Sequence, residues 1–212
     1  MDLSQVFKNY SVVYMKKYLF ILIILLGIGI KFWNKYIIVI ATLPLLFLIY
    51  FFRIPKIVGE RNDKFLTAPT YGKVVKVQER DGLLQIATFI NLWDPHIQYM
   101  PYDGVVKKQI YKKGQFNPAY LFAKGKYNER LVHNILTNKG NISVVQIAGV
   151  CARTIERFVQ EGQAVQQNDE IGLIRFGSRC DVFIPLDNAM NILVKEGDRI
   201  EGGITKIVEF IN

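Results

Sequence analysis

Two apolar runs near the N-terminus most constrain how this chain folds. Tyr18–Ile30 is a run of 13 apolar residues, Tyr36–Phe52 spans 17, and the charged segment Lys31–Lys35 separates them. A helix needs roughly 20 residues to cross a bilayer, with a range of about 17–25. The runs therefore predict a membrane helical hairpin at residues 1–52, with a shallow re-entrant hairpin as the alternative. A cleaved signal peptide is disfavoured, because a second apolar run follows instead of a small-residue cleavage site.

Charge predicts the orientation of this hairpin. Three lysines precede the first run, four basic residues between 53 and 64 follow the second, and the connecting loop carries only two lysines. By the positive-inside tendency, both flanks and the main domain are expected on the cytoplasmic face of the membrane. The net charge of +9 favours an anionic membrane surface over nucleic acid, because no Lys/Arg run exceeds two residues.

Residues 53–212 predict a second, β-rich domain, mainly β with an α+β character. Short runs of Val, Ile, Phe and Tyr are punctuated there by Gly, Pro, Asn and Asp, which is typical of strands and turns. The segment Ala152–Val159 suits either a strand or a short helix. The clearest expected strands are Lys73–Val77, Leu83–Ile90, Val105–Tyr111, Ile142–Ile147, Glu170–Ile174 and Asp181–Ile184.

Two internal echoes occur within this domain. The sequence from Pro69 through Gly72 resembles that from Pro101 through Gly104, and Val159–Val165 resembles Val194–Ile200. The second pair is a Glu-Gly turn between strands, as in barrel-sandwich domains. A duplicated β-unit and a chance likeness of hairpin turns both remain open.

Cysteine and histidine usage excludes several kinds of site. Cys151 and Cys180 cannot make a disulfide framework, and no CxxC pair exists for zinc. With only His96 and His133, we expect no metal site and reduced thiols. Cys151 lies in an apolar run, where a free cysteine is usually a small buried hydrophobe.

The dipeptide Gly177-Ser178 lies between two apolar strands of the stretch Ile171–Pro185. Glycine imposes little steric cost where a nucleophile must approach its carbonyl, and the adjacent Ser178 hydroxyl suits an N→O acyl shift. An ordinary hairpin turn is the alternative. A second stretch, Ile90–Gly104, places His96 among aromatic side chains, and histidine suits proton transfer near neutral pH.

Together these stretches resemble the short, bacterial and archaeal type of phosphatidylserine decarboxylase. The likeness runs from about Phe51 to Leu193, and the Arg175–Pro185 segment resembles the family's processing site. His96 lies in a segment similar to the family's His/Pro/Gly segment. The matching segments, in chain order, are 51–55, 68–74, 94–104, 111–119, 128–130, 145–153 and 175–185.

The resemblance implies that the proenzyme cuts itself between Gly177 and Ser178. The hydroxyl attacks the Gly177 carbonyl, the ester eliminates, and the resulting dehydroalanine hydrolyses to a pyruvoyl group at position 178. A heterodimer of a β chain (1–177) and an α chain (178–212) results, and further association of copies stays open. The pyruvoyl carbonyl forms a Schiff base with phosphatidylserine in the membrane, and loss of carbon dioxide yields phosphatidylethanolamine.

The resemblance also assigns roles to side chains near the processing site. It gives His96 the acid/base role. Independently of the resemblance, Arg175 and Arg179, followed by Arg53 and Lys56, are candidates for holding the substrate's phosphate or carboxylate, because guanidinium matches such anions bidentately. Solvated surface charge is the alternative.

Two departures from the family's pattern bear on self-cleavage. Tyr71 stands where the family commonly has Asp, and Tyr99 stands where longer members have a second His. The expected substitutes for the missing carboxylate are Asp94, Asp103 and Asp181.

The rival readings are a catalytically inactive barrel-sandwich adaptor on a membrane hairpin and a pyruvoyl enzyme for a soluble amino acid. The two apolar runs argue against the second of these.

Overall fold

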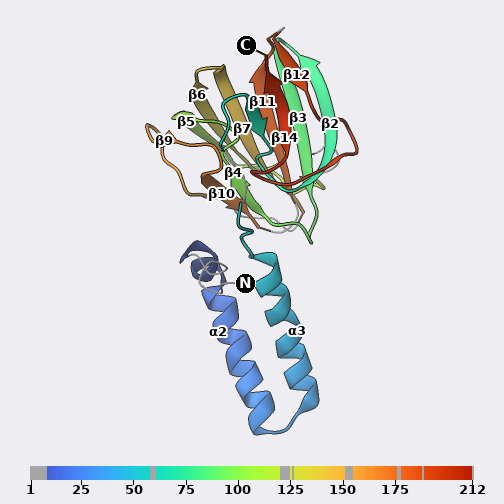
Figure 1. The fold of residues 1–212 in the computed structure, drawn as a ribbon. Coiled ribbons are helices and arrows are strands. Elements are labelled where there is room, and N and C mark those ends of the chain that lie inside the picture. The colour runs from blue at the N-terminus through green and yellow to red at the C-terminus, as the bar shows by residue number, and fades with distance from the viewer. Residues whose placement is uncertain are drawn as a thin grey trace. The chain divides into compact units, whose positions relative to one another are not determined.

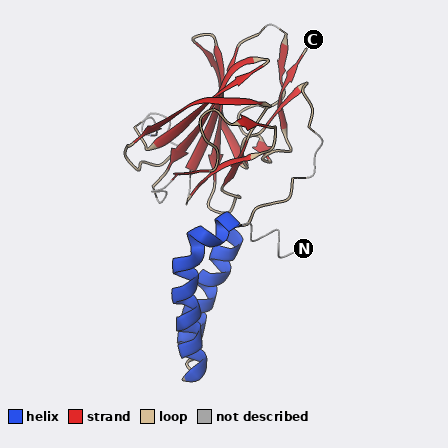
Figure 2. Cartoon of the chain, turned by 90° about the vertical axis from the view of Figure 1, so that its left-hand side faces the viewer, coloured by secondary structure: helices blue, strands red, loops and turns tan. Residues whose placement is uncertain are grey.

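The computed structural model describes residues 9–57, 61–119, 125, 127–150, 155–175, 178–187 and 189–211, with side chains from residue 18 onward. The chain divides into two compact units, Met1–Lys56 and Ile57–Asn212. The first is helical and the second is built of strands (Figure 2). This agrees with the expectation of a helical segment followed by a β-rich domain.

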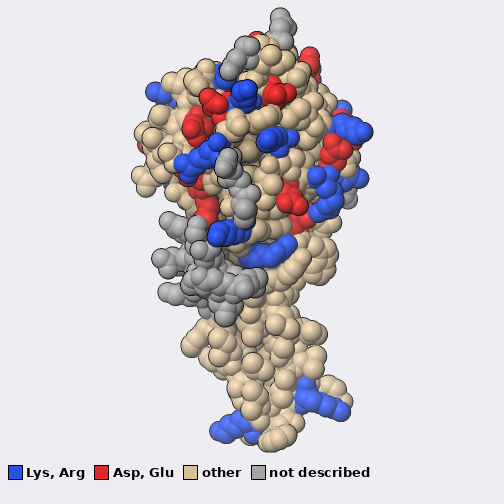
Figure 3. All heavy atoms as spheres, viewed as in Figure 1, with Lys and Arg blue, Asp and Glu red and all other residues tan. Residues whose placement is uncertain are grey.

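The two apolar runs lie in the helices α2 (Asn9–Lys31) and α3 (Lys35–Phe51). Asn34 caps α3, and its side-chain oxygen accepts hydrogen bonds from two backbone N–H groups of the first turn at 3.1 and 3.2 Å. The helices pack closely at Gly29, where a Cβ atom would lie 2.9 Å from the Ile38 side chain. Among the residues whose side chains are described, the visible face of the two helices shows charged side chains only near the helix ends (Figure 3). Within the described residues, no helix combines the length and hydropathy needed for a bilayer crossing.

Among the described residues, the strands of the second unit form three sheets around an apolar core (Figure 1). All six expected strands are present, two of them with the expected bounds. The segment 155–159, whose structure was left open, begins with a strand, while 151–154 lie outside the described residues. The strands are β1 (Phe65–Thr67), β2 (Gly72–Arg80), β3 (Leu83–Ile90), β4 (Ile97–Tyr99), β5 (Gly104–Lys112), β6 (Arg130–Thr137), β7 (Gly140–Ala148), β8 (Ile155–Arg157), β9 (Ala164–Val165), β10 (Glu170–Ile174), β11 (Ser178–Pro185), β12 (Met190–Ile192), β13 (Arg199–Ile200) and β14 (Lys206–Phe210).

The strand order has an internal symmetry. The eight-stranded sheet runs β13-β2-β3-β11-β7-β6-β5-β9, and the two three-stranded sheets run β1-β14-β12 and β4-β10-β8. Strands β4 to β10 therefore repeat the arrangement of β1 to β3 with β11 to β14. One copy of a seven-strand unit is inserted into the other, between β3 and β11.

The hydrogen bonds repeat as well as the strand order. Gly197 N–H donates to the Val74 carbonyl at 2.8 Å, and Gly162 N–H donates to the Val106 carbonyl at 2.7 Å. A bulge follows Val74 in β2 and another follows Val106 in β5. Both turn glycines have positive φ, of 100° for Gly197 and 84° for Gly162. The two sequence echoes thus mark a duplicated β-unit, and the reading as chance similarity of turns is wrong.

The two copies differ in one part of the core. In the second copy, the Gln109 amide donates to His133 Nδ1 at 3.0 Å, and His133 Nε2 donates to the Gln146 amide oxygen at 2.9 Å. The Gln146 amide in turn donates to the Gln98 amide oxygen at 2.7 Å. His133, Gln146 and Gln98 are completely buried. We call these four residues the buried polar chain.

The same four positions are apolar in the first copy. Gln109 faces His133 across β5 and β6 as Val77 faces Ile86 across β2 and β3. The counterparts of Gln109, His133, Gln146 and Gln98 are, in that order, Val77, Ile86, Ile184 and Leu66, which pack in or against the apolar core.

We predict that Gly72→Ala strongly destabilises the β unit. Gly72 has a φ of 145°, and a Cβ atom there would lie 2.2 Å from the Phe89 carbonyl oxygen. Gly82→Ala is the matched control, because Gly82 also has a positive φ but no atom within 4 Å of its Cβ position. Thermal or urea unfolding of the full chain should show a loss above about 2 kcal/mol for Gly72→Ala and about 1 kcal/mol for Gly82→Ala. Equal losses would contradict the steric argument.

The second prediction concerns how the stability of the protein changes at acidic pH. Burial lowers the pKa of His133 below its ordinary value of 6.5. As the pH falls, the unfolded chain therefore takes up a proton on His133 at a higher pH than the folded chain does. The free energy of unfolding should fall as the pH drops below about 6.5 and level off below the pKa of His133 in the folded protein. The slope due to His133 is at most about 1.4 kcal/mol per pH unit. His133→Gln should remove that slope in unfolding measured from pH 7 to pH 5, and an unchanged slope would refute the assignment.

Candidate active site

The predicted processing site lies where the chain passes between the two copies. The chain leaves the first copy after Ile90 and returns to it at Ser178, and these residues are direct partners in β3 and β11. The corresponding partners in the second copy are Thr137 and Gly140, which a short turn connects. The first copy therefore has a hairpin opened by the inserted copy. Gly177, the other half of the predicted cleavage site, lies outside the described residues.

Ser178 has an unusual environment for a polar side chain. It is completely buried, and its Oγ has no hydrogen-bond partner among the described residues. By the alternation of a strand it shares a face with Cys180 and Val182, which belong to the apolar core. An unsatisfied buried hydroxyl costs about 1–3 kcal/mol, so such a group marks a position with a functional reason.

The structure brings His96 to the same end of the sheet. Its carbonyl oxygen accepts a hydrogen bond of 3.2 Å from the N–H of Ile174, the last residue of β10. Ile174 is four residues before Ser178, a path of at most about 14 Å. The segments 90–96 and 174–178 are thus joined at both ends, by the Ile90–Ser178 pairing and by the His96–Ile174 hydrogen bond.

The imidazole of His96 is completely buried and held in one tautomer. Its Nδ1 lies 2.7 Å from the Asp94 carbonyl oxygen. A carbonyl only accepts, so Nδ1 carries the proton, and neutral His96 has its lone pair on Nε2. This is the arrangement required of a side chain that accepts a proton.

Tyr71 and Tyr99, the two departures from the family's pattern, are neighbours in space. Their rings meet edge to face with centroids 6.3 Å apart. Burial, with smaller contributions from Tyr71 and Glu170, raises the pKa of Tyr99 far above its ordinary value. Tyr99 is therefore a neutral phenol, and this pair supplies no carboxylate to the site.

Among the described residues, none of the three carboxylates proposed as substitutes forms a hydrogen bond with the His96 side chain. The Asp94 carboxylate accepts from Asn91 N–H at 2.9 Å and pairs with Arg199. Asp103 occupies the position in the second copy that corresponds to Tyr71 in the first. Its carboxylate accepts a hydrogen bond from the backbone N–H of Gln167. Of the three, Asp94 is the nearest to His96 along the chain.

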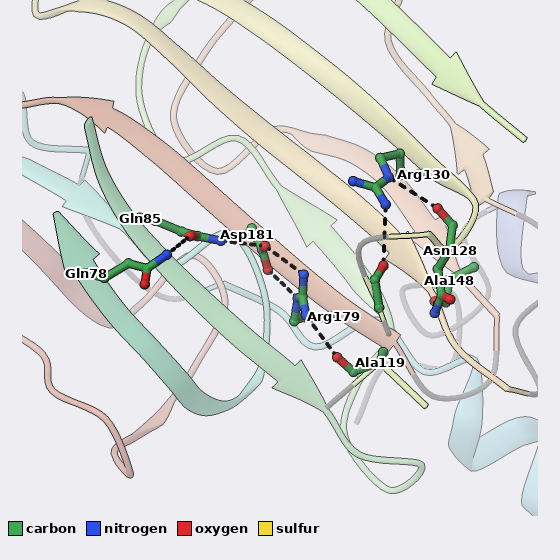
Figure 4. Close-up of polar contacts among 9 residues, drawn as sticks. Gln78, Gln85, Ala119, Asn128, Arg130, Ala148, Arg179 and Asp181 are labelled. Atoms are coloured by element: carbon green, nitrogen blue, oxygen red, sulfur yellow. Dashed lines mark hydrogen bonds and ion pairs between the residues drawn. The ribbon is translucent and has the colours of Figure 1, made fainter. Parts of the chain in front are cut away.

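Asp181 belongs to a separate buried network on β11 (Figure 4). Its carboxylate receives two hydrogen bonds from Arg179, at 2.8 and 3.1 Å, and one from the Gln85 amide at 2.9 Å. Arg179 also donates to the Ala119 carbonyl at 3.1 Å. Burial raises the pKa of Asp181, and Arg179 opposes that rise. By strand alternation, this pair lies on the face opposite Ser178.

The other predicted substrate-binding residue, Arg175, is also engaged with a carboxylate. Its Nη2 donates to Glu156 Oε1 at 2.6 Å, and both side chains are largely buried. Binding of a substrate anion would require Arg175 or Arg179 to share its guanidinium group with that partner. The role of these arginines in substrate binding stays a prediction.

Sequence reasoning did not single out Gln98, which contacts His96 directly. Its amide donates to the His96 carbonyl at 2.7 Å, at the end of the buried polar chain. The available signal was the internal echo that begins at Pro69 and Pro101, which aligns Gln98 with the apolar Leu66 only when it is extended three residues toward the N-terminus. Cys180 is buried in the core, where burial raises its thiol pKa, and Cys151 lies outside the described residues.

Comparison with known proteins identifies the family of this sequence. The family model described as phosphatidylserine decarboxylase matches residues 45–207. A phosphatidylserine decarboxylase proenzyme of Carboxydothermus hydrogenoformans is 32% identical over 189 residues, covering 86% of this chain and 87% of that protein. The proenzyme of the same name from Syntrophus aciditrophicus is 35% identical, covering 81% and 84%.

An archaeal relative extends the comparison. A protein of Methanococcoides burtonii, provisionally named an archaetidylserine decarboxylase proenzyme, is 37% identical over 163 residues, covering 77% of this chain and 75% of that protein. The match of the family model over residues 45–207 and these similarities along most of each sequence lead to one assignment: the chain belongs to the phosphatidylserine decarboxylase family.

Proposed function

We propose that this chain decarboxylates phosphatidylserine to phosphatidylethanolamine, with a pyruvoyl group made from Ser178 by self-cleavage after Gly177. The observation that carries the proposal is the Ser178 hydroxyl, which is completely buried without a hydrogen-bond partner among the described residues. Family membership supports the same reaction. An inactive adaptor would have no use for such a hydroxyl at an opened hairpin.

The surroundings of Ser178 fit a pyruvoyl group. This group is small and uncharged, and the position on β11 is enclosed and apolar on one face. A pyruvoyl group supplies a ketone carbonyl that joins the substrate's amine and takes up the electrons released when carbon dioxide leaves. The buried site keeps water away from this chemistry.

His96 is the proposed acid/base residue. Its Nε2 accepts the proton of the Ser178 hydroxyl during self-cleavage, while Nδ1–H stays bound to the Asp94 carbonyl. In the decarboxylation cycle the protonated imidazole returns a proton to the substrate carbon from which carbon dioxide has left. Because Tyr71 replaces the Asp that is common in the family, and Tyr99 stands where longer members have a second His, we assign self-cleavage to His96 without a partner carboxylate from those positions.

The substrate proposal rests on the serine head group. Relatives are named for phosphatidylserine and for archaetidylserine, which share that head group. Assays with both lipids, and with free serine, would separate a phospholipid enzyme from one acting on a soluble amino acid.

We also propose that α2 and α3 anchor the chain in the membrane, with the β unit on the cytoplasmic face. The support is their apolar sequence and the distribution of lysine and arginine around them. Anchoring brings the enzyme to its lipid in two dimensions and raises the effective concentration of substrate.

The third prediction tests self-cleavage. The wild-type chain should separate under denaturing electrophoresis into fragments 1–177 and 178–212, and intact mass should show no free amine on the smaller one. Ser178→Ala should remain a single chain of 24.4 kDa, and His96→Ala should slow cleavage by about 100-fold or more.

The matched control is Ser143→Ala, which removes a half-buried serine of β7. It should leave cleavage unchanged. A wild-type chain that stays whole and releases no carbon dioxide from phosphatidylserine would refute the proposed function.

The fourth prediction concerns the two fragments after cleavage. Residues 178–212 supply β11, which pairs with β3 and β7, and β13 and β14, which pair with β2 and β1. The smaller fragment should therefore remain bound through size-exclusion chromatography in detergent and separate only in denaturant. Its release from cleaved protein under native conditions would contradict the interleaved topology.

A further inference from the structure

The buried polar chain ends at the candidate catalytic histidine. The Gln98 amide donates to the His96 carbonyl, which also accepts the N–H of Ile174. His96 lies just before β4 and Ile174 ends β10, so this carbonyl joins the two segments that enter and leave the inserted copy. A bond to it fixes the main chain from which the His96 imidazole projects.

The fold itself does not require polar side chains at these four positions. The first copy has the same strands in the same order, with Val, Ile, Ile and Leu there. Apolar packing is non-directional, whereas a buried hydrogen bond is costly to break and fixes one arrangement. The second copy has a directional connection where the first has adaptable packing, and this connection lies in the strands beside His96.

All hydrogen bonds of the buried polar chain run in the same direction. Gln109 donates to His133, His133 donates to Gln146, and Gln146 donates to Gln98. The Gln98 amide in turn donates to the His96 carbonyl oxygen. His133 must be neutral in this arrangement, because a protonated Nδ1 would face the Gln109 donor. The lowered pKa of His133 agrees with this state.

Gly172 is fitted to the polar chain. A Cβ atom at Gly172 would lie 2.4 Å from the Glu156 carbonyl oxygen and 2.6 Å from the Gln146 amide nitrogen, so this glycine leaves space for both the neighbouring strand and the amide. Gly172 pairs with Gln98 in the second copy, and its counterpart Val208 pairs with Leu66 in the first. The two copies therefore also differ at this position, which is Gly172 in β10 and Val208 in β14.

We propose that Gln98, Gln146, His133 and Gln109 are positioning residues that hold the His96 main chain for proton transfer at Ser178. This inference rests on the proposed function. The polar chain touches neither substrate nor reacting atoms, and it acts through the placement of the His96 imidazole.

The test replaces the polar chain by the residues of the other copy: Gln109→Val, His133→Ile, Gln146→Ile and Gln98→Leu together. Replacing all partners by apolar groups leaves no unsatisfied donor within the chain, so thermal stability should be kept or raised. Self-cleavage in cell-free synthesis should nevertheless slow by about 10- to 100-fold, because small misplacement of a catalytic group is costly. The pH dependence of the residual decarboxylation rate should also shift, which a purely structural role would not cause.

Two further variants sharpen the test. His133→Gln can still accept from Gln109 and donate to Gln146, so it should cleave at close to the wild-type rate. Ser143→Ala removes a hydrogen bond to Asn134 on the same two strands, outside the polar chain, and should also leave the rate unchanged. If the fourfold variant fails to fold, the single variant Gln98→Leu takes its place, and its rates of self-cleavage and decarboxylation are compared with those of the wild type.

A folded fourfold variant that cleaves and decarboxylates at the wild-type rate, with the wild-type pH profile, overturns the positioning role. Failure of the proposed function looks different, because the wild-type chain itself would then not cleave. The two failures are distinguished in one experiment.

Discussion

The pairing of β11 between β3 and β7 is the constraint on which the rest of the molecule depends. β11 belongs to the first copy, β7 to the second, and their contact joins the two halves of the eight-stranded sheet. The same pairing sets Ser178 opposite Ile90 and Ala148, at the end of the sheet where the chain enters and leaves the inserted copy. Cleavage before Ser178 would leave this register intact, because the strand is held on both edges.

Because the β unit contains two copies of the same strand arrangement, each copy can be compared with the other. Where both copies agree, as in the bulges after Val74 and Val106, the feature serves the fold. Where they differ, the opened hairpin at Ser178 and Gln146 of the buried polar chain lie toward one end of β11 and β7, whereas the closed turn at Gly140 and Ile184 of the apolar cluster lie toward the other. The candidate site occupies the copy boundary, where the two sets of strands meet and neither copy alone could build it.

Much of the architecture was predictable because local patterns carry it. Apolar runs predicted α2 and α3, and short apolar runs between turn residues predicted β3 and β10 with their bounds. The half-buried strand β6 was not among the expected strands, because His133 and Asn134 interrupt its apolar pattern. The candidate residues Ser178 and His96 were found through their motifs, whereas Gln98 and Gln146 have no local signal, since an isolated glutamine is usually exposed.

The sequence by itself determined the chemistry available: a Gly-Ser link between two strands, one histidine in a Pro-rich segment, two apolar runs and the turn glycines of a repeated unit. The tertiary structure alone decided what these residues face. It inserted one copy into the other, set Tyr71 against Tyr99, engaged Arg179 with Asp181 and connected His133 to His96. These contacts join residues far apart along the chain, and their partners are chosen by strand register and core packing, which no local pattern records.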